Sequence, residues 1–147
     1  MTRVALLDVN VLVALFDPDH VHHDPAHDWF AASRAGGWAS CPLTENGLVR
    51  ILSNASYSGV HETPGRIVER LVAFCGSGEH VFWGDEVSLR DRRLFNAPLA
   101  VTHRQVTDIY LLGLARHKGG RLATFDRSIP VGAVLGADRE HLELVPA

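Results

Sequence analysis

Cysteine and long apolar runs are both scarce in this sequence of 147 residues. The only cysteines, Cys41 and Cys75, have neither the spacing of a zinc knuckle nor that of a redox pair, so we expect two buried, reduced thiols. No segment approaches the ~20 consecutive apolar residues of a membrane-spanning helix. The apolar stretch 4–16 is interrupted by Asp8 and Asn10, which is unlike a signal peptide. These absences predict a cytoplasmic protein without a membrane partner.

Positive charge is also limited, because 14 lysines and arginines face 17 acidic residues and the formal net charge is −3. This argues against a broad basic surface for nucleic acid. It does not argue against a metal-dependent nuclease, because cations bound to carboxylates reverse the local charge. The length, with 46% hydrophobic and 21% charged residues, is typical of one globular domain, which we place at 1–147.

Short apolar runs alternate with helical patterns along the chain. We expect strands at 3–7, 38–41, 81–83, 121–124 and 142–145. We expect helices at 10–16, 25–35, 42–52, 63–74 and 105–117, a weaker helix at 87–95, and a loop at 54–62. The residues expected to face the core from the 63–74 helix are Ile67, Val68, Leu71 and Val72. The alternation predicts an α/β domain around a mostly parallel sheet.

Four acidic residues lie where an apolar segment meets a strand end or a helix start: Asp8, Glu45, Asp108 and Asp126. Asp8 and Asp126 each follow a predicted strand, and the carboxyl ends of parallel strands meet at one edge of the sheet. Glu45 and Asp108 each precede apolar residues at i+3, i+4 and i+7, so both head an inward-facing stripe. Burying an unpaired carboxylate is costly, so these acids should be paired, protonated or metal-bound.

A cluster of these acids would suit Mg²⁺ or Mn²⁺ and the hydrolysis of phosphodiesters. All four are therefore candidate catalytic and metal-ligating residues. Asn10 is placed to orient Asp8 or a water on the metal, and Thr124 is placed to do the same beside Asp126. Simpler roles stay open for each residue. Asp8 or Asn10 can cap a helix, Asp126 can begin a turn, Glu45 can complement a helix dipole, and nearby arginines can form salt bridges with the acids.

The segments around the four acids resemble the PIN-domain ribonucleases, specifically the VapC-type toxins of toxin–antitoxin pairs. The matching segments, in the family's order, are LLDVNVLVALF, PLTENGLVRIL, HRQVTDIYLLGLA and GGRLATFDRSI. The resemblance implies a PIN-like α/β/α sandwich and an endoribonuclease that depends on Mg²⁺ or Mn²⁺. It implies metal ligation chiefly by Asp8 and Asp108, with Glu45 and Asp126 completing the site. It also implies a cognate VapB-type antitoxin whose tail blocks the site, and a homodimer.

An RNA substrate requires contacts to phosphate that the low positive charge leaves unexplained. The candidates are the cationic residues next to the acidic segments, namely Arg50, His103, Arg104 and Arg127. For each of them a solvated surface charge is the alternative.

Two other functions stay open. Asp8 can be read as the covalent nucleophile of a phosphohydrolase. Haloacid-dehalogenase-like enzymes, however, need a second Asp where this chain has Asn10, and a supporting lysine, whereas the only lysine, Lys118, lies near a helix end. The chain can also be a binding module that kept the fold without catalysis, which predicts no metal dependence.

Two groups of side chains have a structural and a functional interpretation. For the histidine-rich patch a zinc site competes with a solvated helix entrance, and the patch consists of His20, His22, His23 and His27. For three aromatic residues we expect a place in the core or in a subunit interface, with base stacking as the alternative: Trp29, Phe30 and Trp83.

Overall fold

The computed structural model describes residues 3–57, 62–100 and 102–147. Five strands form one sheet in the order β3-β2-β1-β4-β5, and all four strand pairings are parallel. The strands are β1 Ala5–Leu7, β2 Trp38–Ser40, β3 His80–Phe82, β4 Arg121–Thr124 and β5 Leu142–Leu144. The predicted α/β fold is thus confirmed. The first strand of the chain is the central strand of the sheet, so the residue directly after β1 lies in the middle of the carboxyl edge.

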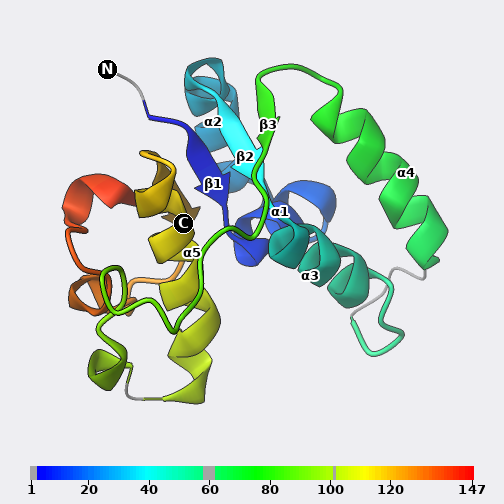
Figure 1. Ribbon diagram of the computed structural model, residues 1–147. Helices are drawn as coiled ribbons and strands as arrows, with labels where there is room; N and C mark the ends of the chain where they lie inside the picture. The colour runs from blue at the N-terminus through cyan, green and yellow to red at the C-terminus, as the bar shows by residue number, and fades with distance from the viewer. Residues whose placement is uncertain (1–2, 58–61, 101) are drawn as a thin grey trace.

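Helices cover both faces of the sheet, as in the predicted α/β/α sandwich (Figure 1). The α-helices are α1 Val9–Phe16, α2 His23–Ser33, α3 Pro42–Leu52, α4 Pro64–Cys75 and α5 Val106–His117. Five short 3₁₀ turns are η1 Arg34–Gly36, η2 Ala97–Leu99, η3 His103–Gln105, η4 Val131–Ala133 and η5 Arg139–His141. Within the described residues, no helix combines the length and apolar character that crossing a membrane requires.

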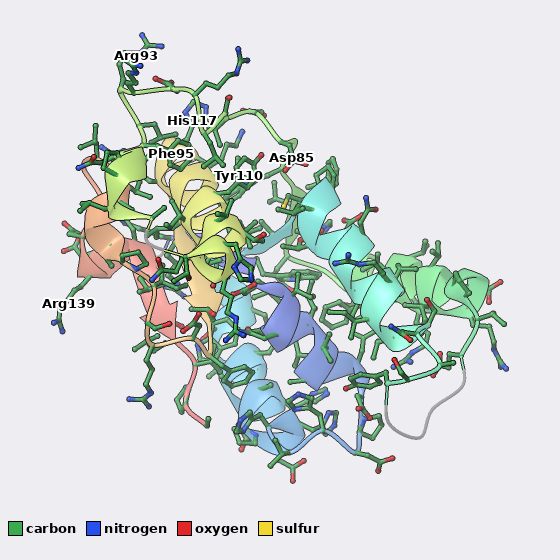
Figure 2. All side chains as sticks on the ribbon, turned by 90° about the horizontal axis from the view of Figure 1, so that it is seen from below. Asp85, Arg93, Phe95, Tyr110, His117 and Arg139 are labelled. Atoms are coloured by element: carbon green, nitrogen blue, oxygen red, sulfur yellow. The ribbon has the colours of Figure 1, made fainter. Side chains whose placement is uncertain are left out.

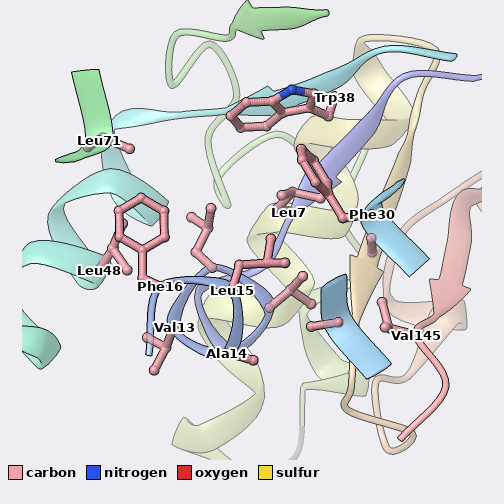
Figure 3. Close-up of a cluster of buried hydrophobic side chains, with 14 of the residues drawn as sticks. Leu7, Val13, Ala14, Leu15, Phe16, Phe30, Trp38, Leu48, Leu71 and Val145 are labelled. Atoms are coloured by element: carbon pink, nitrogen blue, oxygen red, sulfur yellow. The ribbon is translucent and has the colours of Figure 1, made fainter. Parts of the chain in front are cut away.

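Two hydrophobic clusters fill the space between the sheet and its two helical layers. Leu7 belongs to the cluster beneath α1, α2, α3 and α4, and Leu6 belongs to the cluster beneath α5. The two leucines separate in this way because successive side chains of a strand point to opposite faces. In the first cluster the rings of Phe30 and Trp38 pack edge to face at 5.5 Å (Figure 3). Each large apolar side chain buried here stabilises the fold by roughly 1.5–3 kcal/mol.

The prediction of a helix at 87–95 is wrong. The segment is an irregular connection with turns, and it leads from the edge strand β3 across to α5 (Figure 2). The hydroxyl of Tyr110 donates a 3.0 Å hydrogen bond to Asp85, and Lys118 pairs with Glu86. Phe95 closes the connection by packing against α5 at Gly113. These contacts with α5 hold the connection in an irregular conformation in place of the predicted helix.

The outward side of α4 also differs from the expectation. Ile67 and Leu71 are buried, but Val68 is 45% exposed and Val72 is 68% exposed, because nothing in the described part of the chain packs over them fully. The other predicted helices and strands are present, with ends shifted by at most two residues. The predicted loop begins as a turn at Asn54, and residues 58–61 of it lie outside the described part of the chain.

Candidate active site

Asp8 lies at the carboxyl end of the central strand and is 4% exposed. Its Oδ1 accepts a 2.7 Å hydrogen bond from the backbone N–H of Val9, and its Oδ2 accepts a 2.7 Å bond from the hydroxyl of Thr124. Asp8 is therefore the N-cap of α1, and the alternative in which Asn10 caps this helix is wrong, because Asn10 lies inside its first turn. Burial raises the pKa of Asp8 in spite of these hydrogen bonds, and the charge of Asp126 adds to the increase.

The side chain of Thr124 connects the carboxyl ends of the neighbouring strands β1 and β4 through hydrogen bonds. β4 pairs with β1 so that Ala123 lies opposite Leu7, which brings Thr124 beside Asp8. Besides donating to Asp8, the Thr124 oxygen accepts bonds from the Asn10 side chain (3.3 Å) and the Asp126 backbone N–H (3.0 Å). The carbonyl oxygen of the Asn10 side chain in turn accepts a 3.4 Å bond from the Phe125 N–H. The two predicted supporting residues, Asn10 and Thr124, thus lie around Asp8.

Asp108 and Asp126 form an interacting pair of carboxyl groups at the same edge. Asp108 is half-buried in the first turn of α5, and its pKa is raised to about 7. Burial is the main cause, followed by the charge of Asp8 and by hydrogen bonding to Asp126. The pKa of Asp126 is lowered, chiefly because the hydroxyl and the N–H of Ser128 donate bonds of 2.6 and 2.8 Å to its Oδ1. Near neutral pH Asp108 is therefore protonated in part of the molecules, and it shares that proton with a charged Asp126.

The donor chemistry of these three aspartates fits a hard divalent cation. Among the described residues, no lysine, arginine or histidine forms an ion pair with any of them. The alternative of structural salt bridges from Arg50, Arg104 or Arg127 therefore has no support in these contacts. Three neighbouring carboxyl groups without a cationic partner repel one another, which is consistent with the raised pKa values of Asp8 and Asp108. Mg²⁺ and Mn²⁺, which prefer oxygen ligands, would relieve this repulsion.

Glu45 makes its side-chain hydrogen bond with β2 rather than with one of the aspartates. Its Oε2 accepts a 2.5 Å hydrogen bond from the hydroxyl of Ser40 on β2. One ligand atom each from Glu45, Cys75 and His80 lies within 4.8 Å of the others, and none of the three aspartates belongs to this group of described residues. The participation of Glu45 in the aspartate site therefore stays a prediction.

A hollow opens in front of Asp8 and Asp108, between α1, the length of α3 from Leu43 to Ile51, and the amino-terminal part of α5. It measures ≈ 460 Å³, within the range of roughly 300–1,000 Å³ that is usual for ligand pockets. Of the four predicted phosphate contacts, Arg50 lines this hollow. His103 and Arg104 are exposed in the turn before α5, and Arg127 is exposed directly after Asp126.

Sequence reasoning missed three polar residues at this site. His20 and Thr107 line the hollow, and Ser128 holds the carboxylate of Asp126. Thr107 and Ser128 lie within two residues of predicted acids in the sequence, and this proximity could have identified them as site residues. His20 follows a turn at Asp17. No sequence pattern indicates that this turn brings His20 back to the hollow beside Asp8.

The histidine patch and the aromatic residues have structural contacts. His23 Nδ1 lies 2.7 Å from the carbonyl oxygen of Ala14, and His27 Nε2 lies 3.3 Å from that of Leu15, so both bind the last turn of α1. The four histidines form no group of metal ligands among the described residues. For the aromatics the structural interpretation holds. Phe30 and Trp83 are buried, and the indole N–H of Trp29 donates to Glu143.

Comparison with known proteins matches the family model of the PIN domain to residues 5–133. Ribonuclease VapC39 of Mycobacterium tuberculosis is 45% identical over 132 residues, covering 90% of this chain and 95% of the relative. Ribonuclease VapC44 of the same organism is 42% identical over 138 residues, covering 94% and 96%. The crystal structure of Mycobacterium tuberculosis VapC20, a toxin that cleaves the sarcin–ricin loop, superposes with a TM-score of 0.58 at 13% identity, covering 82% of this chain and 87% of that one. The chain therefore belongs to the PIN-domain family and, within it, to the VapC ribonucleases.

Proposed function

We propose that this protein is a metal-dependent endoribonuclease and the toxin of a toxin–antitoxin pair. The observation that supports this most directly is the group Asp8, Asp108 and Asp126 at the carboxyl edge of the sheet, without a cationic partner among the described residues. Relatives that cover most of the chain carry the name ribonuclease, which supports the reaction class.

In this proposal Asp8 and Asp108 are the main ligands of Mg²⁺ or Mn²⁺, and Asp126 completes the site. When bound, the cation withdraws electron density from a phosphoryl oxygen and favours deprotonation of the attacking water. Thr124 fixes the rotamer of Asp8 through its 2.7 Å hydrogen bond, so one ligand is oriented before substrate arrives. Asp108, with its pKa of about 7, exchanges its proton with solvent under physiological conditions.

Arg50 in the hollow and three exposed basic residues beside the acids in the sequence are the proposed contacts of the RNA backbone. Arg50 is the strongest candidate because it shares the hollow with Asp8 and Asp108. His103, Arg104 and Arg127 flank the same acids in the chain and are assigned the same role. Glu45 stays a proposed fourth acid of the catalytic cluster, which requires its side chain to leave Ser40.

We also propose the partners and location that accompany this function. They are a VapB-type antitoxin that covers the hollow, a second copy of the chain in a homodimer, and the cytoplasm as the compartment. The similarity to curated VapC proteins supports the antitoxin and the RNA substrate. Light scattering of the purified chain tests the dimer, and co-purification with the product of a neighbouring small reading frame tests the antitoxin.

The experiment that tests the catalytic proposal compares the wild type with Asp8→Asn and Asp108→Asn, both nearly isosteric. Total RNA is incubated with each protein in Mg²⁺, in Mn²⁺ and in excess chelator, and new RNA ends are mapped. We expect discrete ends from the wild type with metal, and none with chelator or from either variant. Asp28→Asn, on the exposed face of α2, is the matched control and should cleave like the wild type.

Two results would favour the other functions. Cleavage that continues in excess chelator, or in both variants, would remove the aspartate site from the mechanism. A phosphorylated Asp8, trapped with a phosphomonoester substrate, would support the phosphohydrolase. Asp8 is poorly placed for that chemistry, since both of its oxygens already accept hydrogen bonds and the side chain is buried.

A further inference from the structure

A second group of metal-ligating side chains contains none of the three aspartates and lies on the face of the sheet that α4 covers. It combines Glu45 from the first turn of α3, Cys75 at the end of α4, and His80 at the start of β3. One ligand atom from each residue lies within 4.8 Å of the other two. All three side chains are half-buried, so a small solute reaches them from solvent. The proposed ribonuclease mechanism uses neither Cys75 nor His80.

The donor set differs in kind from that of the aspartate site. A thiolate, an imidazole and a carboxylate are the ligands of Zn²⁺ and similar transition-metal ions, whereas Mg²⁺ and Mn²⁺ take oxygen ligands. In a tetrahedral zinc site with bonds of about 2.0–2.3 Å, neighbouring donor atoms lie about 3.3–3.8 Å apart. The present separations, all below 4.8 Å, therefore require closure by about 1 Å, which small side-chain rotations provide.

Surrounding contacts already orient two of the three ligands. The buried hydroxyl of Ser40 lies 2.5 Å from Oε2 of Glu45 and 2.8 Å from Nε2 of His80. The ring of His80 also packs on Trp38, with 4.5 Å between the ring centroids. Hydrogen-bonding and packing partners of this kind are typical of metal sites, where they fix the rotamers of the ligands.

We propose that Glu45, Cys75 and His80 bind a thiophilic divalent cation of the zinc class, with water or the Ser40 hydroxyl in the fourth position. A sulfur–metal bond forms as the S–H bond of Cys75 breaks, and the proton passes to the buffer. The bound ion links α3, α4 and β3. The proposal shares Glu45 with the proposed catalytic cluster, but it adds Cys75 and His80 and takes a different ion, so it can be tested separately.

The protonation states of the free ligands agree with this assignment. Burial lowers the pKa of His80, which keeps its ring neutral and able to coordinate at neutral pH. Burial and the charge of Glu45 raise the pKa of Cys75, so the ion has to displace the thiol proton.

Titration of the metal-free protein with Co²⁺, a spectroscopic substitute for Zn²⁺, tests the proposal. The wild type should show a thiolate-to-cobalt charge-transfer band and the intense visible bands of tetrahedral cobalt, saturating at one equivalent. One equivalent of Zn²⁺ should remove these bands. Cys75→Ser should abolish the charge-transfer band, and His80→Gln should weaken Co²⁺ binding at least about 10-fold. Circular dichroism establishes that each variant is folded.

Matched variants separate this site from the other candidates. Asp108→Asn, which disables the proposed catalytic site, should keep the cobalt spectrum, so failure of one proposal is distinguishable from failure of the other. His27→Ala should also keep it, because the histidine patch is not involved. Absence of the charge-transfer band in the wild type would overturn the proposal. Persistence of that band in Cys75→Ser would do so as well, since the thiolate would then belong to Cys41.

Discussion

The hydroxyl of Thr124 donates a 2.7 Å hydrogen bond to the buried carboxylate of Asp8, although 116 positions separate the two residues in the chain. The same hydroxyl oxygen accepts bonds from Asn10 and from the backbone of Asp126. The Thr124 side chain thereby forms hydrogen bonds with groups from the end of β1, from α1 and from the turn after β4. This contact therefore fixes Asp8 relative to Asn10 and to the turn that carries Asp126.

Replacement of Thr124 by valine should weaken the binding of Mn²⁺ by about 10- to 100-fold, as loss of an orienting partner does in other metal sites. The variant should also be less stable by about 1–3 kcal/mol, because buried polar groups lose their partner. Calorimetric titration with Mn²⁺ and urea unfolding measure the two effects. Thr107→Val, in the same hollow but exposed, is the control. Equal Mn²⁺ affinity in the two variants would contradict the role of Thr124.

The pKa of Asp108 sets a pH window for metal binding. Its value of about 7 in the folded protein lies above the ordinary value of 3.8, so the folded state holds more protons between these values. The contribution of Asp108 to the stability of the metal-free protein is therefore complete below about pH 3.8 and lost as the pH rises to about 7. A cation has to displace this proton, so its apparent affinity should rise by up to about tenfold per pH unit and level off above pH 7.

Mn²⁺ titrations between pH 5.5 and 8.5, about 1.5 units either side of this value, test the window. Asp108→Asn removes the titrating group and should flatten the pH dependence as well as weaken binding. An affinity that is constant from pH 5.5 to 7 in the wild type would show that Asp108 is already ionised without metal.

Removal of the Arg50 side chain should affect substrate binding rather than catalysis. If Arg50 contacts a phosphate in both the ground state and the transition state, Arg50→Ala raises KM by roughly 10-fold and leaves kcat unchanged. Cleavage of a short RNA at several salt concentrations measures both constants. Arg92→Ala, on an exposed surface elsewhere, should match the wild type. A fall in kcat at constant KM would place Arg50 in the reaction itself.

Two glycine substitutions should have opposite effects on stability. A Cβ at Gly113 would lie 2.2 Å from the ring of Phe95, which is buried against α5, so Gly113→Ala should destabilise the fold by about 1–3 kcal/mol. A Cβ at Gly65 meets nothing within 4 Å, and Gly65→Ala in the first turn of α4 should be neutral or stabilise by up to about 1 kcal/mol. Thermal unfolding followed by circular dichroism compares them. Equal melting temperatures would refute the close packing at Gly113.

The rule that an acid heading an apolar helical stripe faces inward was applied to both Asp108 and Glu45. The structure gives the two acids different partners. Both acids head an apolar stripe, and both point inward as predicted. On α5 the stripe, with Leu111 and Leu112, brings Asp108 to the carboxyl edge of the sheet. On α3 the stripe, with Leu48 and Leu52, faces the other hydrophobic cluster and directs Glu45 to Ser40. Periodicity identifies the buried side of a helix but not which group lies opposite it.

Local sequence patterns also do not show what packs outside a helix or which path a long connection takes. Val68 and Val72 fit the helical stripe of α4, yet whether they are buried depends on what packs outside the helix. The segment 87–95 has helix-compatible spacing, but it has to carry the chain from β3 to α5. The parallel sheet could be predicted, and so could the positions of Asp8 and Asp126 at strand ends. Both follow from the short apolar runs and their alternation with helices.

The position of β1 at the centre of the sheet has a consequence for how the protein is made. A ribosome releases the amino end first, so a growing chain carries Asp8 early but lacks Asp108 and the β1–β4 pairing until most of its residues have emerged. A chain whose proposed activity is RNA cleavage should therefore be inactive while the ribosome is still synthesising it. Prematurely terminated products that end before β4 should, for the same reason, be tolerated by the cell.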